Sequence, residues 1–241
     1  MKLQTKVFPN IEALSGGALE EMLRIVRQAV QRDGRSSISL SGGHTPEKMF
    51  ALWTQGQYRN ATPWESVHLF WGDDRYVPYT DPLSNYGMAK RLLLDHVPIP
   101  AANVHPMPTE GPDPDEAARA YAAELRSFFG TDPPAFDVQL LGLGGEGHTA
   151  SLFPGSPALE EREAWCLAVT VPATPPQRLT LTYRILNQAQ TTYFLVAGES
   201  KRQILRAIAA EPDGTASRYP AARVRPAGPV HWYLDRAAAG E

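Results

Sequence analysis

The chain has 241 residues, and its 23 Lys and Arg against 26 Asp and Glu give a formal charge of −3. This length suits one large α/β domain, so we expect residues 1–241 to fold as a single domain. The weak negative charge offers no long-range attraction for nucleic acid or an anionic membrane, and we expect neither as a partner.

The cysteine content and the lengths of the apolar runs indicate the cellular compartment in which the protein is expected. The single cysteine, Cys166, lacks a second cysteine in the chain and is expected to be a buried structural thiol. The sequence begins without an apolar stretch of signal length, and no run approaches the roughly 20 apolar residues that a spanning helix needs. We therefore expect a cytoplasmic protein.

The first helix and strand signals come early in the chain. Apolar residues at helical spacing predict an amphipathic helix over about residues 15–32, with Gly34 at its end. The run Ile38–Leu40 predicts a short strand, which a tight turn separates from another helix. Thr45 has the chemistry of that helix's N-cap, and Pro46 suits its first position.

The same order of signals recurs along the rest of the chain. Further strands are expected at Val67–Trp71, Phe136–Leu143 and Thr191–Ala197, and further helices at Ser84–Leu94, Asp115–Phe129 and around Ile204–Ile208. Leu179–Tyr183 alternates more in polarity and is expected to add a strand toward an edge. Strands that alternate with helices indicate an α/β fold: a doubly wound, mostly parallel, Rossmann-like sheet with helices on both faces.

Polar and glycine-rich segments follow the predicted strands, where open parallel sheets bind ligands. Four segments qualify: Ser41–Thr45, Asp73–Arg75, Gly142–His148 and Glu199–Lys201. Together they offer hydroxyl and amide groups, an arginine, a histidine with an acidic neighbour, and a lysine. This set suits a small anionic substrate.

The turn Ser41-Gly42-Gly43 precedes a predicted helix, whose N-terminal amides favour an anion such as phosphate. A glycine pair in such a turn is also explained by backbone geometry alone. Neither this turn nor Gly142–Gly145 matches a P-loop or a full dinucleotide fingerprint, so we expect no nucleotide cofactor.

His148 is the candidate general base, because it lies among small residues after a strand and its ordinary pKa suits proton abstraction near neutrality. Glu146 is its candidate orienting carboxylate; the alternative is a structural histidine bonded within a loop. The other histidines are expected to be structural or exposed to solvent, although His44 lies in the first loop. They are at positions 44, 68, 96, 105 and 231.

The cationic candidates each have an alternative role. Arg75 is placed either to bind phosphate or an oxyanion, or to pair with Asp73 or Asp74. Lys201 is either a substrate contact or a solvated surface residue. The chain has no nucleophile elbow and no metal-ligand spacing, which favours direct attack by water without a covalent intermediate or a metal.

Three segments in this order resemble the 6-phosphogluconolactonase family: Ser39–Pro46 (SLSGGHTP), Asp73–Pro78 (DDRYVP) with Ser84-Asn85-Tyr86, and Gly142–Pro154 (GLGGEGHTASLFP). Arg178–Thr182 and Gly198–Lys201 continue the likeness. Glu146 stands where the family usually has Asp, and Asp74 where it usually has Glu, so both carboxylates move by one methylene.

The resemblance implies hydrolysis of 6-phospho-D-glucono-1,5-lactone to 6-phosphogluconate. We expect no cofactor, and a monomer or weak homo-oligomer. The resemblance assigns catalysis to His148, Glu146 and Arg75. Substrate binding falls to the residues Ser41, Gly42, Gly43, Thr45, Lys201 and Arg178.

Two other functions are weighed against this one. A glucosamine-6-phosphate deaminase shares the Ser-Gly-Gly turn, but the segment Thr149–Pro154 lacks the Asn-Glu-Pro ending of that enzyme class. A sugar-phosphate sensor of the bacterial repressor type needs a helix-turn-helix module, and the segment before Ile38 is too short for one.

Overall fold

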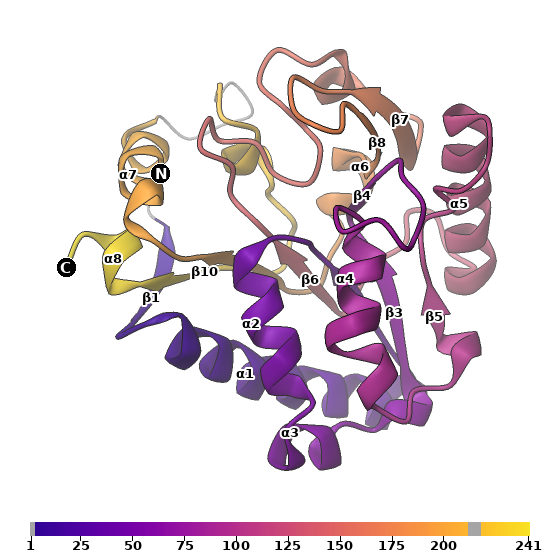
Figure 1. Ribbon diagram of the computed structural model, residues 1–241, viewed down its shortest axis with the longest axis horizontal. Helices are drawn as coiled ribbons and strands as arrows, with labels where there is room; N and C mark the ends of the chain where they lie inside the picture. Colours follow the sequence, from indigo (N-terminus) through magenta and orange to yellow (C-terminus); the bar gives the residue numbers. More distant parts are fainter. Residues whose placement is uncertain (1–2, 212–217) are drawn as a thin grey trace.

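A computed structural model describes residues 3–211 and 218–241, and a parallel sheet of seven strands runs through them (Figure 1). The strand order is β1-β10-β9-β6-β2-β3-β5, and every neighbouring pair is parallel. The bounds are β1 Gln4–Phe8, β10 Val230–Asp235, β9 Thr192–Val196, β6 Val138–Leu141, β2 Ser36–Leu40, β3 Val67–Trp71 and β5 Val104–His105. The predicted α/β class and parallel sheet are confirmed.

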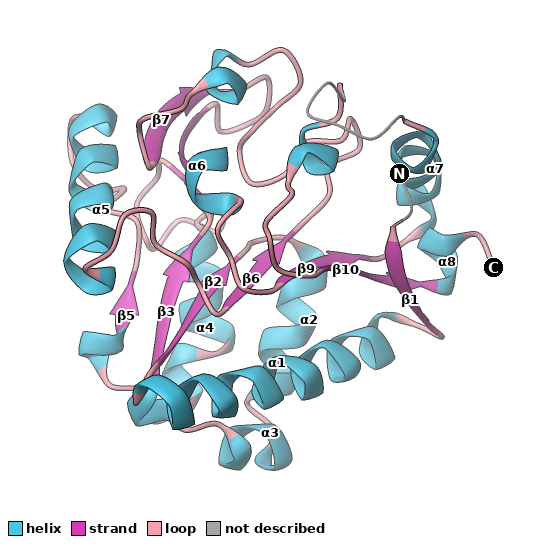
Figure 2. Ribbon diagram, turned by 180° about the vertical axis from the view of Figure 1, so that it is seen from behind, coloured by secondary structure: helices cyan, strands magenta, loops and turns pink. Residues whose placement is uncertain are grey.

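Helices cover both faces of this sheet (Figure 2). One face carries α1 Ile11–Asp33, α2 His44–Trp53, α3 Gly56–Ala61 and α4 Asn85–Leu92. The other carries α5 Pro114–Phe129 and α6 Tyr183–Leu186, while α7 Arg202–Ala210 and α8 Arg236–Ala239 lie at the β1 end. Because of this cover, β2, β6 and β9 are buried along their whole length. No described helix is long and apolar enough to cross a membrane.

A second, antiparallel sheet of three strands lies above the main one in the order β4-β8-β7. Its strands are β4 Asp73–Arg75, β8 Gln177–Leu181 and β7 Cys166–Thr170. The expected extra strand near residue 179 is therefore the middle strand of this small sheet rather than an edge of the large one. Asp73–Arg75 is a strand and not only a turn, because its backbone pairs with β8.

The chain reverses its direction of travel across the main sheet between β2 and β6. From β2 it proceeds to β3 and β5, and it then returns to β6 on the other side of β2 and continues to β9 and β10. Such a switch point leaves a crevice at the carboxyl ends of the two diverging strands. Ser41 directly follows β2 and Gly142 directly follows β6, so both loops border that crevice.

Capping residues decide where the helices begin. α1 begins at Ile11, ahead of the predicted residue 15, because the side chain of Asn10 accepts the N–H of Ala13 at 2.9 Å. The predicted N-cap at Thr45 is wrong: α2 begins at His44 after Gly43, whose φ of +100° favours glycine. The predicted cap at Ser84 is confirmed, since its hydroxyl accepts the N–H of Gly87, but α4 ends at Leu92.

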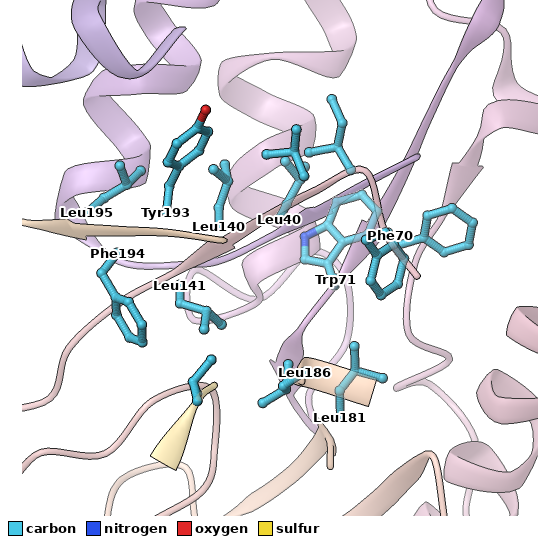
Figure 3. Close-up of a cluster of buried hydrophobic side chains, with 14 of the residues drawn as sticks. Leu40, Phe70, Trp71, Leu140, Leu141, Leu181, Leu186, Tyr193, Phe194 and Leu195 are labelled. Atoms are coloured by element: carbon cyan, nitrogen blue, oxygen red, sulfur yellow. The ribbon is translucent and has the colours of Figure 1, made fainter. Parts of the chain in front are cut away.

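Side chains of successive strand residues point to opposite faces of the sheet, and both faces are packed (Figure 3). Tyr193 and Leu195 lie on one side of β9, and Phe194 lies on the other. The ring of Phe194 stacks on Trp232 of the neighbouring strand, with centroids 4.0 Å apart. Cys166 is a buried free thiol, as predicted, and burial raises its pKa to about 12.

Candidate active site

A cleft of about 340 Å³ opens at the carboxyl ends of β2, β6 and β9, at the switch point of the sheet. Every predicted site residue lines this cleft except Glu146. The lining residues are Ser41–Pro46, Asp73, Arg75, Asn85, Gly142–Gly145, His148, Ala150, Arg178, Leu195–Ala197 and Lys201. Segments that are more than 150 residues apart in the chain are thus brought together, as the four post-strand segments predicted.

The loop after β2 presents backbone amides to the cleft. It comprises Ser41, Gly42 and Gly43 and leads directly into α2, whose first N–H groups lack partners inside the helix. Gly42 packs closely against the side chain of Asn85, so that a Cβ at Gly42 would lie 1.8 Å from Oδ1 of Asn85. The loop can therefore be this close to α4 only with glycine at position 42, and it forms a small anion cradle.

Strand β4 sends its side chains in two directions. Asp74 is fully buried, and its carboxylate accepts the backbone N–H groups of Asn85 at 2.6 Å and Tyr86 at 2.9 Å at the start of α4. Burial raises the pKa of Asp74 to about 6. Its neighbours Asp73 and Arg75 both line the cleft, as the two-residue period of a strand requires. Asp74 is therefore a structural residue that fixes α4 to β4.

Arg75 makes no ion pair with Asp73 or Asp74, which was the alternative reading of the DDR motif. Its Nη1 instead donates to the carbonyl of Leu83 at 2.6 Å, and its guanidinium lines the cleft. Arg178 stands opposite Arg75 in the register of β4 and β8, and it is also buried in the cleft wall. Burial lowers the pKa of Arg178, and the nearby charge of Asp73 opposes this effect.

Asp73 is a site residue that the sequence did not single out. Its side chain is 6% exposed and accepts the hydroxyl of Ser151 at 2.7 Å. The charge of Asp73 raises the pKa of both His148 and Arg178, so the carboxylate lies near both side chains. The available signal was the spacing of Asp73 and Arg75, which are two residues apart. This spacing directs both side chains to the same side only if the three residues form a strand.

The glycine-rich loop after β6 holds His148 in one position. The N–H of Gly144 donates to the carbonyl of His148 at 2.8 Å, which closes the loop on itself. A Cβ at Gly144 would lie 2.0 Å from Nδ1 of His148, so the ring rests directly on the Gly144 backbone. The ring of Phe153 also stacks on the imidazole, with centroids 4.0 Å apart.

Glu146 approaches the same imidazole from outside the cleft. Its Oε2 lies 3.1 Å from Nδ1 of His148, although the two groups are not aligned as a hydrogen bond. Burial lowers the pKa of His148, and the charge of Glu146 offsets part of this shift. The imidazole is therefore neutral near pH 7, which is the form that a general base requires.

Lys201 lies at the cleft rim in a 3₁₀ turn, Glu199–Lys201, between β9 and α7. It was expected one turn inside a helix, but Arg202 is the first residue of α7. The charge of Lys201 helps to lower the pKa of Glu146, so the ammonium lies near that carboxylate.

His44, the first residue of α2, also lines the cleft, and its Nδ1 lies 3.3 Å from Oε2 of Glu47.

The described part of the chain contains no group of three or more His, Cys, Asp or Glu side chains that could hold a metal ion. The polar groups of the cleft are cationic side chains, backbone amides, hydroxyl and amide side chains, one carboxylate, and the imidazoles of His44 and His148. This combination suits a substrate that carries a phosphate and reacts at a carbonyl.

A family model described as glucosamine-6-phosphate isomerases/6-phosphogluconolactonase matches residues 9–232. The chain belongs to this family. It is 42% identical to a 6-phosphogluconolactonase of Synechocystis over 241 residues, which cover 99% of this chain and 98% of that one. The described fold, the family and the length thus agree with the resemblance that the motifs indicated.

Solved structures of the same family have the same fold. The 6-phosphogluconolactonase of Trypanosoma brucei has a TM-score of 0.86 and 29% identity, with 99% of this chain and 98% of that chain covered. A monomeric glucosamine-6-phosphate deaminase has a TM-score of 0.82 over 99% of both chains, but its identity is 19%. At that identity the likeness shows a shared fold alone, and it does not indicate deaminase activity for this chain.

Proposed function

We propose that this chain is a 6-phosphogluconolactonase, which hydrolyses 6-phospho-D-glucono-1,5-lactone to 6-phosphogluconate in the second step of the oxidative pentose phosphate pathway. The relatives at about 40% identity over the full length support this activity. The observation that carries the proposal is the position of His148: it lines a cleft rich in cationic side chains, and one ring nitrogen is covered by protein.

The tautomer of His148 follows from its contacts. Nδ1 is buried against Gly144 and faces the carboxylate of Glu146, which favours a proton on this nitrogen. Nε2 is then unprotonated and is the nitrogen available to a water molecule in the cleft. Glu146 orients the ring and stabilises the imidazolium that forms when Nε2 takes a proton.

The reaction follows in two steps. The water oxygen attacks C1 of the lactone while its proton passes to Nε2 of His148, and a negative charge develops on the C1 oxygen. When this tetrahedral species collapses, the bond between C1 and the ring oxygen breaks. The imidazolium returns its proton to that oxygen, which leaves as the C5 hydroxyl, and the product acid then ionises in water.

Positive charge supports both ends of the substrate. The loop Ser41–Gly43, with Thr45 at the start of α2, would hold the phosphate, and Lys201 at the rim adds charge. Arg178 and its register partner Arg75 would stabilise the C1 oxyanion. Removing one such donor from an oxyanion site typically costs about 2.7–4 kcal/mol in the barrier.

Three further parts of the proposal concern the state of the protein. A single domain over residues 1–241 is supported by the one family match that spans residues 9–232. A cytoplasmic location is supported by the free thiol of Cys166, which suits a reducing compartment. A monomer or weak homo-oligomer stays a prediction, and sedimentation of the purified chain tests it.

The test is the consumption of freshly generated 6-phosphogluconolactone by the wild type and His148→Ala, with and without a chelator. The lactone also hydrolyses spontaneously, so every rate is read against a blank. We expect acceleration that survives the chelator and is lost in a folded His148→Ala. A variant with near wild-type kcat would refute the role of His148. No acceleration by the wild type would move the assignment to deamination of glucosamine 6-phosphate.

A further inference from the structure

A turn more than 70 residues downstream of His148 contacts the glycine-rich loop after β6 at Gly147, the residue before His148. This turn comprises Tyr219 and the 3₁₀ segment Pro220–Arg223. The backbone N–H of Ala221 donates to the carbonyl of Gly147 at 2.9 Å. That carbonyl belongs to the peptide group that joins Gly147 to His148, so the hydrogen bond fixes the plane from which the His148 side chain departs.

The ring of Tyr219 covers the same glycine. A Cβ at Gly147 would lie 2.6 Å from Cδ1 of Tyr219, which shows that the ring packs on the glycine Cα. Gly147 has φ +90°, a conformation that residues with side chains rarely adopt. Gly145, two residues earlier, has no neighbour within 4 Å of a Cβ, so the outer part of the loop lacks such support among the described residues.

The turn is itself anchored to the body of the protein. The hydroxyl of Tyr183, at the start of α6, donates to the carbonyl of Pro220 at 2.8 Å, and both residues are buried. On the far side of the turn, Arg223 pairs with Glu160 at 3.0 Å. The contacts therefore run without interruption from α6 through the turn to the peptide group of His148.

We infer that Tyr219 and Tyr183 are positioning residues for catalysis: Tyr219 holds Gly147, Tyr183 holds the turn, and together they aim the His148 imidazole into the cleft. This inference rests on the proposed role of His148 as the base. Neither tyrosine lines the cleft, so their effect falls on the chemical step rather than on substrate binding. A displacement of about 1 Å at a reacting group can reduce the rate by roughly 10²-fold.

The test compares Tyr219→Ala, Tyr219→Phe and Tyr183→Phe in the full-length protein. We expect Tyr219→Ala to lower kcat by roughly 10- to 100-fold with KM nearly unchanged. Tyr219→Phe keeps the ring and should have a kcat close to that of the wild type. Tyr183→Phe removes only the hydroxyl and should lower kcat more than Tyr79→Phe, a matched control that also loses a hydroxyl bond to a backbone carbonyl, that of Met107 at 2.9 Å.

A second readout does not depend on turnover. The imidazole signals of His148 in NMR spectra, assigned with His148→Ala, should shift in Tyr219→Ala and stay in place in Tyr219→Phe. A folded Tyr219→Ala with wild-type kcat and unmoved signals would overturn the inference. If Tyr219→Ala does not fold, Tyr183→Phe decides: behaviour equal to Tyr79→Phe overturns it. An inactive wild type would refute the proposed function, while the NMR comparison would still test the positioning.

Discussion

The backbone of Gly144 and the imidazole of His148 are in direct contact, with room for no side-chain atom between them: a Cβ at position 144 would lie 2.0 Å from Nδ1. Even the smallest side chain at this position must push the ring away from its place in the cleft. The glycine therefore provides the surface against which the imidazole of His148, the proposed base, rests.

We expect Gly144→Ala to fold and to lose roughly 10²-fold in kcat, because the displaced imidazole no longer reaches the attacking water. The matched control is Gly145→Ala in the same loop, where a Cβ would meet nothing within 4 Å. Steady-state kinetics on both variants, with thermal unfolding to verify the fold, make the comparison. Equal activity of the two variants would contradict the contact as a constraint on the base.

Glu146 should affect the pH dependence of the reaction more than its maximum rate. Burial lowers the pKa of His148 and Glu146 opposes that shift, so Glu146→Gln should lower this pKa further. Because the neutral imidazole is the active form in the proposed mechanism, the acid limb of kcat/KM should move to lower pH. The plateau should fall by up to about fivefold, since an exposed ion pair contributes about 0.2–1 kcal/mol.

The measurement for Glu146→Gln is kcat/KM from pH 5 to 8 against the wild type with the same substrate, so that titration of the substrate phosphate affects both curves equally. Glu146→Asp, which restores the carboxylate that is usual in the family, should keep the acid limb close to that of the wild type. An acid limb of Glu146→Gln that stays in place would show that the carboxylate does not act on the pKa of His148, and movement to higher pH would contradict the sign of the effect.

Arg178 and Lys201 should differ in the kinetic parameter that they control. The charge of Arg178 helps to lower the pKa of His148, so the guanidinium lies near the proposed base, whereas Lys201 follows the neighbouring strand β9. We expect Arg178→Met to lower kcat by roughly 10²-fold or more, as for loss of an oxyanion donor. Lys201→Met should mainly raise KM. The opposite split would assign the phosphate to Arg178 and the oxyanion to Lys201.

Local patterns in the sequence were sufficient for most of the main sheet. The bounds expected for β3 are those observed, and α5 begins one residue before the prediction, because apolar periodicity and capping residues are local properties. Strands β1, β5 and β10 of the main sheet were not predicted. The residues of β1 are largely exposed at the sheet edge and follow no buried pattern, and their strand character comes from pairing with β10.

The site was predictable as far as it follows strands and not where it depends on pairing. His148 and the loop after β2 lie where post-strand loops must lie in a doubly wound sheet. β4 is a strand of three polar residues, and only its partner β8, about 100 residues later, makes it one. That pairing directs Asp73 into the cleft and Asp74 away from it, so no property of the DDR motif alone separates their roles.

A hydrogen-bonded chain of two histidines and a glutamate lies at the β5 edge of the sheet, away from the cleft. Oε1 of Glu124 lies 2.7 Å from Nδ1 of His105, and Nε2 of His105 lies 3.1 Å from Nδ1 of His68. A carboxylate can only accept, so His105 donates to Glu124 and accepts from His68. Burial, followed by the charges of His105 and Arg35, lowers the pKa of His68 to about 4.

This lowered pKa makes the fold sensitive to acid. The unfolded chain protonates His68 near its ordinary pKa of 6.5, whereas the folded protein does so only near 4. The free energy of unfolding contributed by His68 is therefore complete above about pH 6.5 and is lost as the pH falls toward 4. Since His68 is only partly buried, we expect a total effect of about 1 kcal/mol.

The variant that tests this effect is His68→Asn, whose amide can still donate to His105 but does not titrate. Urea unfolding of the wild type and variant at several values between pH 7 and 4.5 gives the difference in their free energies of unfolding. Asp74, whose pKa is raised to about 6, contributes a slope of the opposite sign in the same range, and the difference between the two proteins removes it. We expect the variant to gain stability relative to the wild type as the pH falls. A difference that is independent of pH would show that the histidine pair does not titrate on unfolding.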